Sequence, residues 1–146
     1  MSQVKTELWS RIVGKLLECS TESAASEESV GDYLAVYAVE LGADIHTVDL
    51  RAADQSADAL AILAQRLRFP DYFGQNLDAL YDMTGEYADV FQAQLDARNG
   101  AVPQVWLIHS RAAQEKELFP VLDALRDAMS GATGVGLSIL WVVSAD

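Results

Sequence analysis

The chain has little of what several common classes of protein require. Its one cysteine, Cys19, excludes an internal disulfide and fits a reducing compartment. No uninterrupted apolar run approaches the ~20 residues of a membrane-spanning helix. The first residues, MSQVKTELWSRIVGKLLECS, scatter charges among apolar side chains and lack the continuous apolar core of a signal peptide. A cytoplasmic location is therefore expected.

Basic residues are also scarce. Lys and Arg number 10 against 22 Asp and Glu, which gives a formal net charge of −12 at pH 7. Nucleic acids and anionic membranes bind basic surfaces, so neither is expected as a ligand. A basic protein partner would instead be attracted at long range and at low salt. An acidic composition that serves solubility alone is the simpler alternative.

The composition and the order of the segments predict an α/β fold. The 146 residues, 51% of them apolar, suffice for one domain with a real core. Strand character is found in residues 44–50, 102–110 and 136–144. Helical patterns lie between these strands, over residues 54–68, 77–84 (closed by Gly85), 88–97 and 112–129. Strands separated by helices pair in parallel, so we expect a small three-stranded parallel sheet packed with helices.

Residues 1–43 are expected to form a helical N-terminal extension to a domain of residues 44–146. Apolar residues have helical spacing over 3–18 and again over 30–41, and a polar, acidic linker joins the two segments. The extension is expected to cover the sheet or one of its edges. Dimerisation through the side that carries Trp9, or binding of a second partner, are the alternatives. A monomer is expected for the whole chain.

The stretch PDYFGQNLDALYD, residues 70–82, carries the sharpest functional signal. Asn76 is typical of a helix N-cap, and Gly74 permits a tight loop before it. Asp78 lies in the first predicted turn, where the helix dipole favours a carboxylate. Asp82 follows one turn later, near the predicted helix end, where the dipole and Asp78 both oppose it. A carboxylate placed against local rules indicates a function beyond folding; a solvated surface residue is the alternative.

The same stretch resembles the signature of the barstar family of intracellular ribonuclease inhibitors. In that signature a proline, an acidic residue and two aromatics precede Gly-x-Asn, followed by x-Asp-Ala-Leu-aromatic-Asp, and every position of residues 70–82 conforms. The order of strands and helices over residues 44–146 also agrees. The resemblance implies binding and not catalysis: a loop and an acidic helix would plug the active site of a small basic ribonuclease.

The resemblance also implies which residues bind the partner. Asp82 would be the central plug against the cationic groups that hold the scissile phosphate, and Asp78 would face the basic rim. The full set is Tyr72, Phe73, Gly74, Asn76, Asp78, Ala79, Tyr81, Asp82, Thr84 and Gly85. The chain departs from the family pattern in that Tyr81 replaces a tryptophan, Glu86 follows Thr84-Gly85 where an aromatic is usual, and the connection over 86–102 is longer.

Other functions find less support in the sequence. Asp78 and Asp82 share one stripe and should titrate alike, which disfavours an acid–base enzyme. His46 and His109 lie in predicted strands, and no P-loop, nucleophile elbow or dinucleotide fingerprint occurs. No His or Cys has ligand spacing to the two aspartates, so no metal or cofactor is expected. The main alternative is an interaction module whose basic partner is not a ribonuclease.

Overall fold

The computed structural model describes residues 42–70, 74, 76–97, 102–131, 134 and 136–144, together with the backbone of residues 16–20. The strands are β1 (Leu16–Ser20), β2 (Asp44–Asp49), β3 (Gln104–Arg111) and β4 (Leu137–Ser144). The helices are α3 (Ser56–Arg66), α4 (Leu77–Ala97), a short 3-10 helix η2 (Ala112–Gln114) and α5 (Glu115–Ser130).

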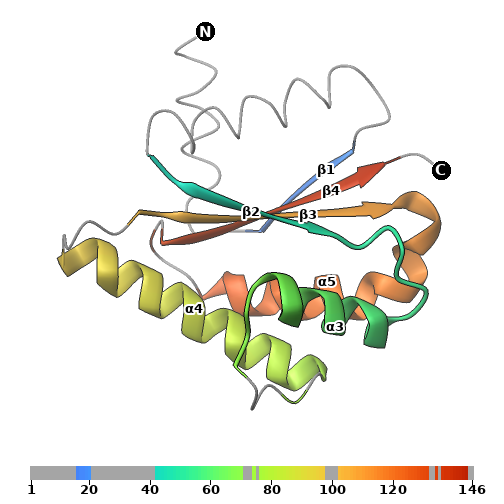
Figure 1. Ribbon diagram of the computed structural model, residues 1–146, viewed down its shortest axis with the longest axis horizontal. Helices are drawn as coiled ribbons and strands as arrows, with labels where there is room; N and C mark the ends of the chain where they lie inside the picture. Colours follow the sequence, from blue (N-terminus) through green and yellow to red (C-terminus); the bar gives the residue numbers. More distant parts are fainter. Residues whose placement is uncertain are drawn as a thin grey trace, which may run out of the picture.

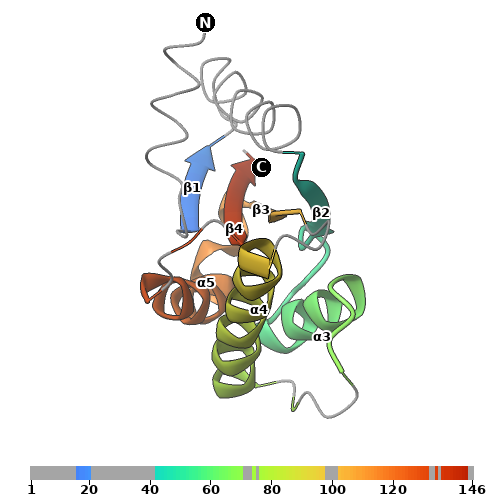
Figure 2. The same cartoon turned by 90° about the vertical axis from the view of Figure 1, so that its left-hand side faces the viewer.

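The four strands form one parallel sheet in the order β1-β4-β3-β2. The chain steps from β2 to β3 to β4 in one direction, and right-handed crossovers then place the connecting helices on the same face. Figure 1 and Figure 2 show α3, α4 and α5 together on one face of the sheet. The expected α/β fold, with three parallel strands packed with helices, is confirmed.

β1 corrects part of the expectation for the N-terminal region. A helix was predicted over residues 3–18 and a linker from residue 19, but residues 16–20 form a strand that pairs in parallel with residues 139–143 of β4. Pairing along the sheet edge supplies backbone hydrogen bonds that outweigh a local helical pattern. The remaining predicted elements of this region lie outside the described residues. The division of the chain at residue 43 stays a prediction.

The core lies between the sheet and the three helices. β4 is flanked on both sides by other strands, and each of its residues from Leu137 to Val142 is buried, as its continuous apolar sequence predicted. Leu63 of α3, Leu80 of α4 and Leu125 of α5 are fully buried members of one cluster with the sheet. Each helix therefore presents one apolar side to the sheet and leaves the opposite side in solvent.

α4 is a single helix of 21 residues that passes straight through Gly85. The prediction that the motif helix ends at Gly85 is wrong, and so is a separate helix over 88–97. Beyond the glycine, the ring of Tyr87 packs against Phe69 and Trp106, with centroids 5.4 and 6.0 Å away. These contacts outweigh the roughly 0.5–1 kcal/mol that an interior glycine costs a helix. Neither α4 nor any other described helix is long and apolar enough to cross a membrane.

Gln114 joins the connection after β2 to the start of α5. Its side chain is buried, and its Nε2 donates to the carbonyl oxygens of Leu50 and Ala53, both at 2.7 Å. Its Oε1 accepts from the backbone N–H of Arg111 at 2.7 Å. A buried amide with these partners is satisfied on both ends. Gln114 lies at the start of the helix predicted over residues 112–129, where nothing local distinguishes it from its charged neighbours.

Replacing Gly85 by alanine is expected to raise the free energy of unfolding by about 0.5–1 kcal/mol. α4 runs through this position, and an added Cβ would meet no atom within 4 Å. Thermal unfolding followed by circular dichroism measures the change. Gly42→Ala is the control: Gly42 has a φ of 66°, so that variant should lose about 1 kcal/mol or more. A loss of stability in Gly85→Ala would contradict the continuous helix.

Candidate functional site

The start of α4 is held by the predicted cap. Asn76 Oδ1 accepts a hydrogen bond from the Ala79 N–H at 2.8 Å, and the Asn76 carbonyl accepts from the Leu80 N–H at 2.9 Å. This confirms Asn76 as the N-cap residue. Leu80 is fully buried and Leu77 packs against the core. The cap and these two leucines together fix where the helix begins and how it is rotated.

That rotation turns Asp78, Tyr81 and Asp82 outward. Both carboxylates are exposed, and the Tyr81 side chain is 47% exposed between them. Spacings of three and four residues place all three side chains on one surface. Asp82 lies in the second turn of a long helix and not near its end. The dipole penalty expected for Asp82 is therefore wrong, and this carboxylate is opposed instead by the like charges of Asp78 and Glu86, each four residues away.

The acidic surface continues along the whole helix. Five acidic side chains lie within an arc of about 80° at 100° per residue, and all are exposed: Asp78, Asp82, Glu86, Asp89 and Asp96. The sequence of α4 contains no Lys or Arg. We call these five side chains the acidic stripe. Its second half was missed because the helix was expected to stop at Gly85, although the apolar spacing of Leu80, Met83, Tyr87 and Phe91 continues past it.

The remaining predicted binding residues fall into four groups. Gly74 is exposed, and a Cβ there would lie 3.1 Å from Asn76 Nδ2, so the loop passes close to the cap. Ala79 and Gly85 are half-buried. Thr84 points inward: it is 0% exposed, and its hydroxyl has no hydrogen-bond partner within the described residues. Tyr72 and Phe73 lie outside the described residues.

The structure thus brings Asp78, Tyr81 and Asp82 together on one exposed surface, with Gly74 and Asn76 at its start. Thr84 is turned away from this surface and cannot contact a partner docked on it. A convex, acidic surface with one exposed aromatic ring suits the binding of a basic protein. Among the residues that the structure describes, no group of three or more His, Cys, Asp or Glu side chains could hold a metal ion.

A second polar group lies at the carboxyl ends of the strands. Arg51 Nε and Nη2 each bond Asp49, both at 2.9 Å, and the hydrogen bonds and charge of Arg51 lower the pKa of Asp49 to about 2. His109 hydrogen-bonds to the Ser144 hydroxyl, and burial followed by the charge of Arg51 lowers the pKa of His109. Arg51 therefore engages the carboxylate of Asp49, and the hydrogen bond between His109 and Ser144 joins the ends of β3 and β4.

Comparison with known families identifies the region that contains this surface. Residues 43–140 match the family model described as Barstar (barnase inhibitor). The match covers more than half of the chain and includes β2, α3, the loop before α4 and the whole of α4. A search among curated proteins found no match.

Asn76→Ala is expected to lower the free energy of unfolding by about 1 kcal/mol, because the Ala79 N–H loses its hydrogen bond to the Asn76 side chain. Asn76→Asp keeps an oxygen acceptor and adds a negative charge at the positive end of the helix, so its stability should equal or exceed that of the unaltered chain. Urea unfolding measures both variants. Equal stability of the alanine variant and the unaltered chain would contradict the cap.

Proposed function

Because the chain belongs to the barstar family, we propose that it inhibits a small basic ribonuclease. The exposed surface of α4 and the loop before it would block the active site of the enzyme. The family description supports a protein-binding role of the barnase-inhibitor kind. The observation that carries the finer proposal is the exposed pair Asp78 and Asp82 around Tyr81. The place of action that we propose is the cytoplasm.

The chemistry of the two carboxylates fits a site built to hold phosphates. Asp78 and Asp82 are separated by about 6 Å along the helix axis, at 1.5 Å per residue. A ribonuclease holds the RNA backbone with preorganised cationic donors, and a carboxylate that reaches them forms short, charge-assisted hydrogen bonds. Once water is excluded, these pairs are strong enough to compete with the substrate phosphate. Asp82, farther from the loop, would fill the phosphate site, and Asp78 would meet its rim.

Both carboxylates are available for a partner. Within the described part of the chain, neither Asp78 nor Asp82 forms an ion pair or a side-chain hydrogen bond. The rigid helix holds them in position before binding, so association costs little conformational freedom beyond that of the two side chains themselves. Tyr81 offers an apolar ring with a hydroxyl, a combination enriched at protein interfaces. The surface therefore combines charge, an aromatic contact and preorganisation.

The rest of the acidic stripe would act at a distance. Glu86, Asp89 and Asp96 lie one to four turns beyond Asp82 on the same side of α4. We assign them to steering: a basic enzyme is drawn to this side of the molecule, which raises the association rate at low salt. This effect should weaken as ionic strength rises, whereas the desolvated contacts of Asp82 should persist.

Asp82→Ala is expected to weaken inhibition of a cognate ribonuclease by at least about 100-fold, because one partner of a buried charge pair is removed. The melting temperature should stay the same or rise slightly, since the repulsion from Asp78 is relieved. Titration of the protein against a panel of small basic ribonucleases, followed by RNA cleavage, measures the inhibition. Asp123→Ala on α5, an exposed carboxylate elsewhere, is the control for the loss of one charge and should inhibit normally.

Two outcomes would contradict this proposal. If Asp82→Ala unfolds the protein, Asp82 has a structural role and not a binding role. If the unaltered protein binds a basic nuclease without blocking RNA cleavage, or blocks none of the panel, the surface of α4 serves a basic partner other than a ribonuclease.

A further inference from the structure

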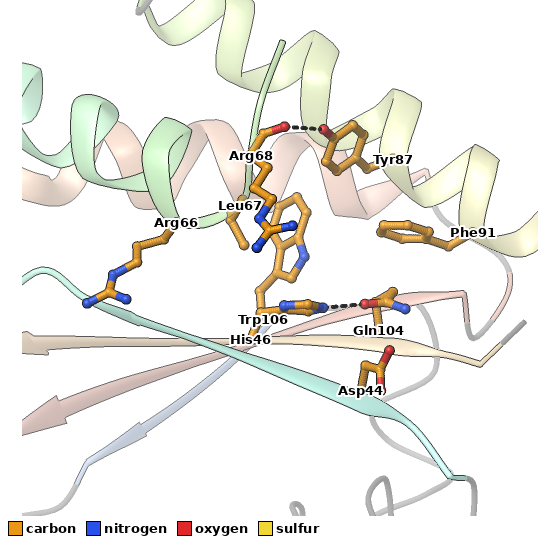
Figure 3. A pocket seen from close by; sticks show the side chains of 9 residues that line it. All are labelled: Asp44, His46, Arg66, Leu67, Arg68, Tyr87, Phe91, Gln104 and Trp106. Atoms are coloured by element: carbon orange, nitrogen blue, oxygen red, sulfur yellow. Dashed lines mark hydrogen bonds between the residues drawn. The ribbon is translucent and has the colours of Figure 1, made fainter.

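A pocket lies on the opposite side of α4 from the acidic stripe. It has a volume of about 550 Å³ and is formed by the edge strand β2, its neighbour β3, the end of α3 and the second half of α4 (Figure 3). Sites for small organic ligands commonly have volumes of roughly 300–1,000 Å³. None of the predicted partner-binding residues lines it. The pocket is therefore separate from the surface proposed to bind a ribonuclease.

Three aromatic rings form its wall. Tyr87 lies with its ring centroid 5.5 Å from that of Phe91 and 6.0 Å from that of Trp106. The hydroxyl of Tyr87 donates to the Arg68 carbonyl at 3.2 Å, which holds its ring in place. Phe91 is half-buried and its ring points into the pocket, whereas Trp106 is only 1% exposed at the base. This wall can receive a planar aromatic ring by stacking.

Two arginines give the pocket a positive charge. Arg66 and Arg68 both line it, and the Arg68 guanidinium points toward the sheet beside Trp106 (Figure 3). Neither arginine forms an ion pair with a described residue. The chain has 22 acidic residues against 10 Lys and Arg, yet this pocket is lined by two arginines that have no acidic partner among the described residues. Unpaired guanidinium groups are well suited to bind a phosphate or a carboxylate.

The backbone of Arg68 is held in a conformation that favours glycine. Its φ is 56°, and the Phe69 N–H donates to the Ala64 carbonyl at 2.9 Å, which is the hydrogen bond of a Schellman helix end. Glycine usually occupies this position, and another residue costs about 1–2 kcal/mol there. Strain retained in this way often marks a ligand site. Here it places the guanidinium in the pocket.

The far end of the pocket presents acceptors. Gln104 Nε2 donates to the Val102 carbonyl at 3.3 Å, which orients its amide so that Oε1 accepts from His46 Nε2 at 2.6 Å. The exposed carboxylate of Asp44 lies at the same end, away from Arg66 in Figure 3. Sheet pairing produces this arrangement, because Asp44 is opposite Gln104 and His46 is opposite Trp106. A ligand with N–H donors at one end could donate hydrogen bonds to these acceptors.

We propose that this pocket binds a nucleoside monophosphate. The base would stack on Phe91 and Tyr87 with its N–H groups toward Asp44, and the phosphate would be held by Arg68 and Arg66. Asp44 and Arg66 lie at opposite ends of the pocket (Figure 3), as the base and the phosphate do in such a ligand. The negative charge of the whole chain is largely screened at physiological salt beyond about 8 Å, so the local arginines dominate. This proposal does not depend on inhibition of a ribonuclease.

The test is a calorimetric titration of the full chain with AMP, GMP, CMP and UMP. At least one nucleotide is expected to bind with a dissociation constant below about 1 mM, and its nucleoside and inorganic phosphate should each bind at least about tenfold more weakly. Arg68→Gly removes the guanidinium while glycine accepts the φ of 56°. That variant should keep its melting temperature or gain slightly, and lose at least about tenfold in nucleotide affinity.

Lys116→Gln is the matched control, because it removes one exposed positive charge at the start of α5, away from the pocket. Its nucleotide affinity should be unchanged. Three results would overturn the proposal: no heat of binding with any of the four nucleotides at millimolar concentration, equal affinity for inorganic phosphate and nucleotide, or undiminished binding in a folded Arg68→Gly variant.

Discussion

Leu80 and Met83 are buried on the inner side of α4, and Tyr87 and Phe91 continue this side along the next two turns. This apolar side packs against α5 and β4. Because a helix repeats every 3.6 residues, packing one side fixes what every other residue of the helix faces. The same packing turns the acidic stripe to solvent and turns the rings of Tyr87 and Phe91 to the pocket. Both candidate sites therefore depend on one helix being rigid and correctly rotated.

Charge is distributed unevenly over this scaffold. The acidic stripe holds five carboxylates without a single cation on the same helix. Arg66 and Arg68 lie at the end of α3, at the pocket on the other side of α4. If the acidic residues served solubility alone, opposite charges interspersed along the helix would keep the surface soluble and would also stabilise the helix. The separation of the two signs agrees with the two proposals, a basic partner on one side of α4 and an anionic ligand on the other.

Much of the fold could be predicted from the sequence because its signals are local. The apolar run of β4 and the Asn76 cap each depend on a few consecutive residues, and both are confirmed. The helix boundary at Gly85 failed for the opposite reason: glycine is locally a helix breaker, but contacts with Phe69 and Trp106, distant in sequence, hold α4 together. β1 was also missed, because its partner strand lies more than a hundred residues away.

The two candidate sites differ in the same way. The exposure of Asp78 and Asp82 follows from a consecutive motif, whereas Thr84 of the same prediction is buried. The second half of the acidic stripe was missed, and that these residues bind a partner stays a prediction. The pocket could not be predicted, because its residues are distant from one another in the sequence. Sheet pairing brings Asp44 beside Gln104, and tertiary packing adds the end of α3. The positive φ of Arg68 is a local feature of the backbone, but it too is seen only in the structure.

We propose that the exposed side of α4 is the surface that meets a basic ribonuclease. Backbone amide NMR shifts of the isotopically labelled protein, recorded as a small basic ribonuclease is added, locate the interface residue by residue. Stoichiometric changes are expected to concentrate in residues 74–86, with α5 and the edge strand β2 unaffected. Changes concentrated in β2 and α3, with α4 unaffected, would place the interface elsewhere and overturn this proposal.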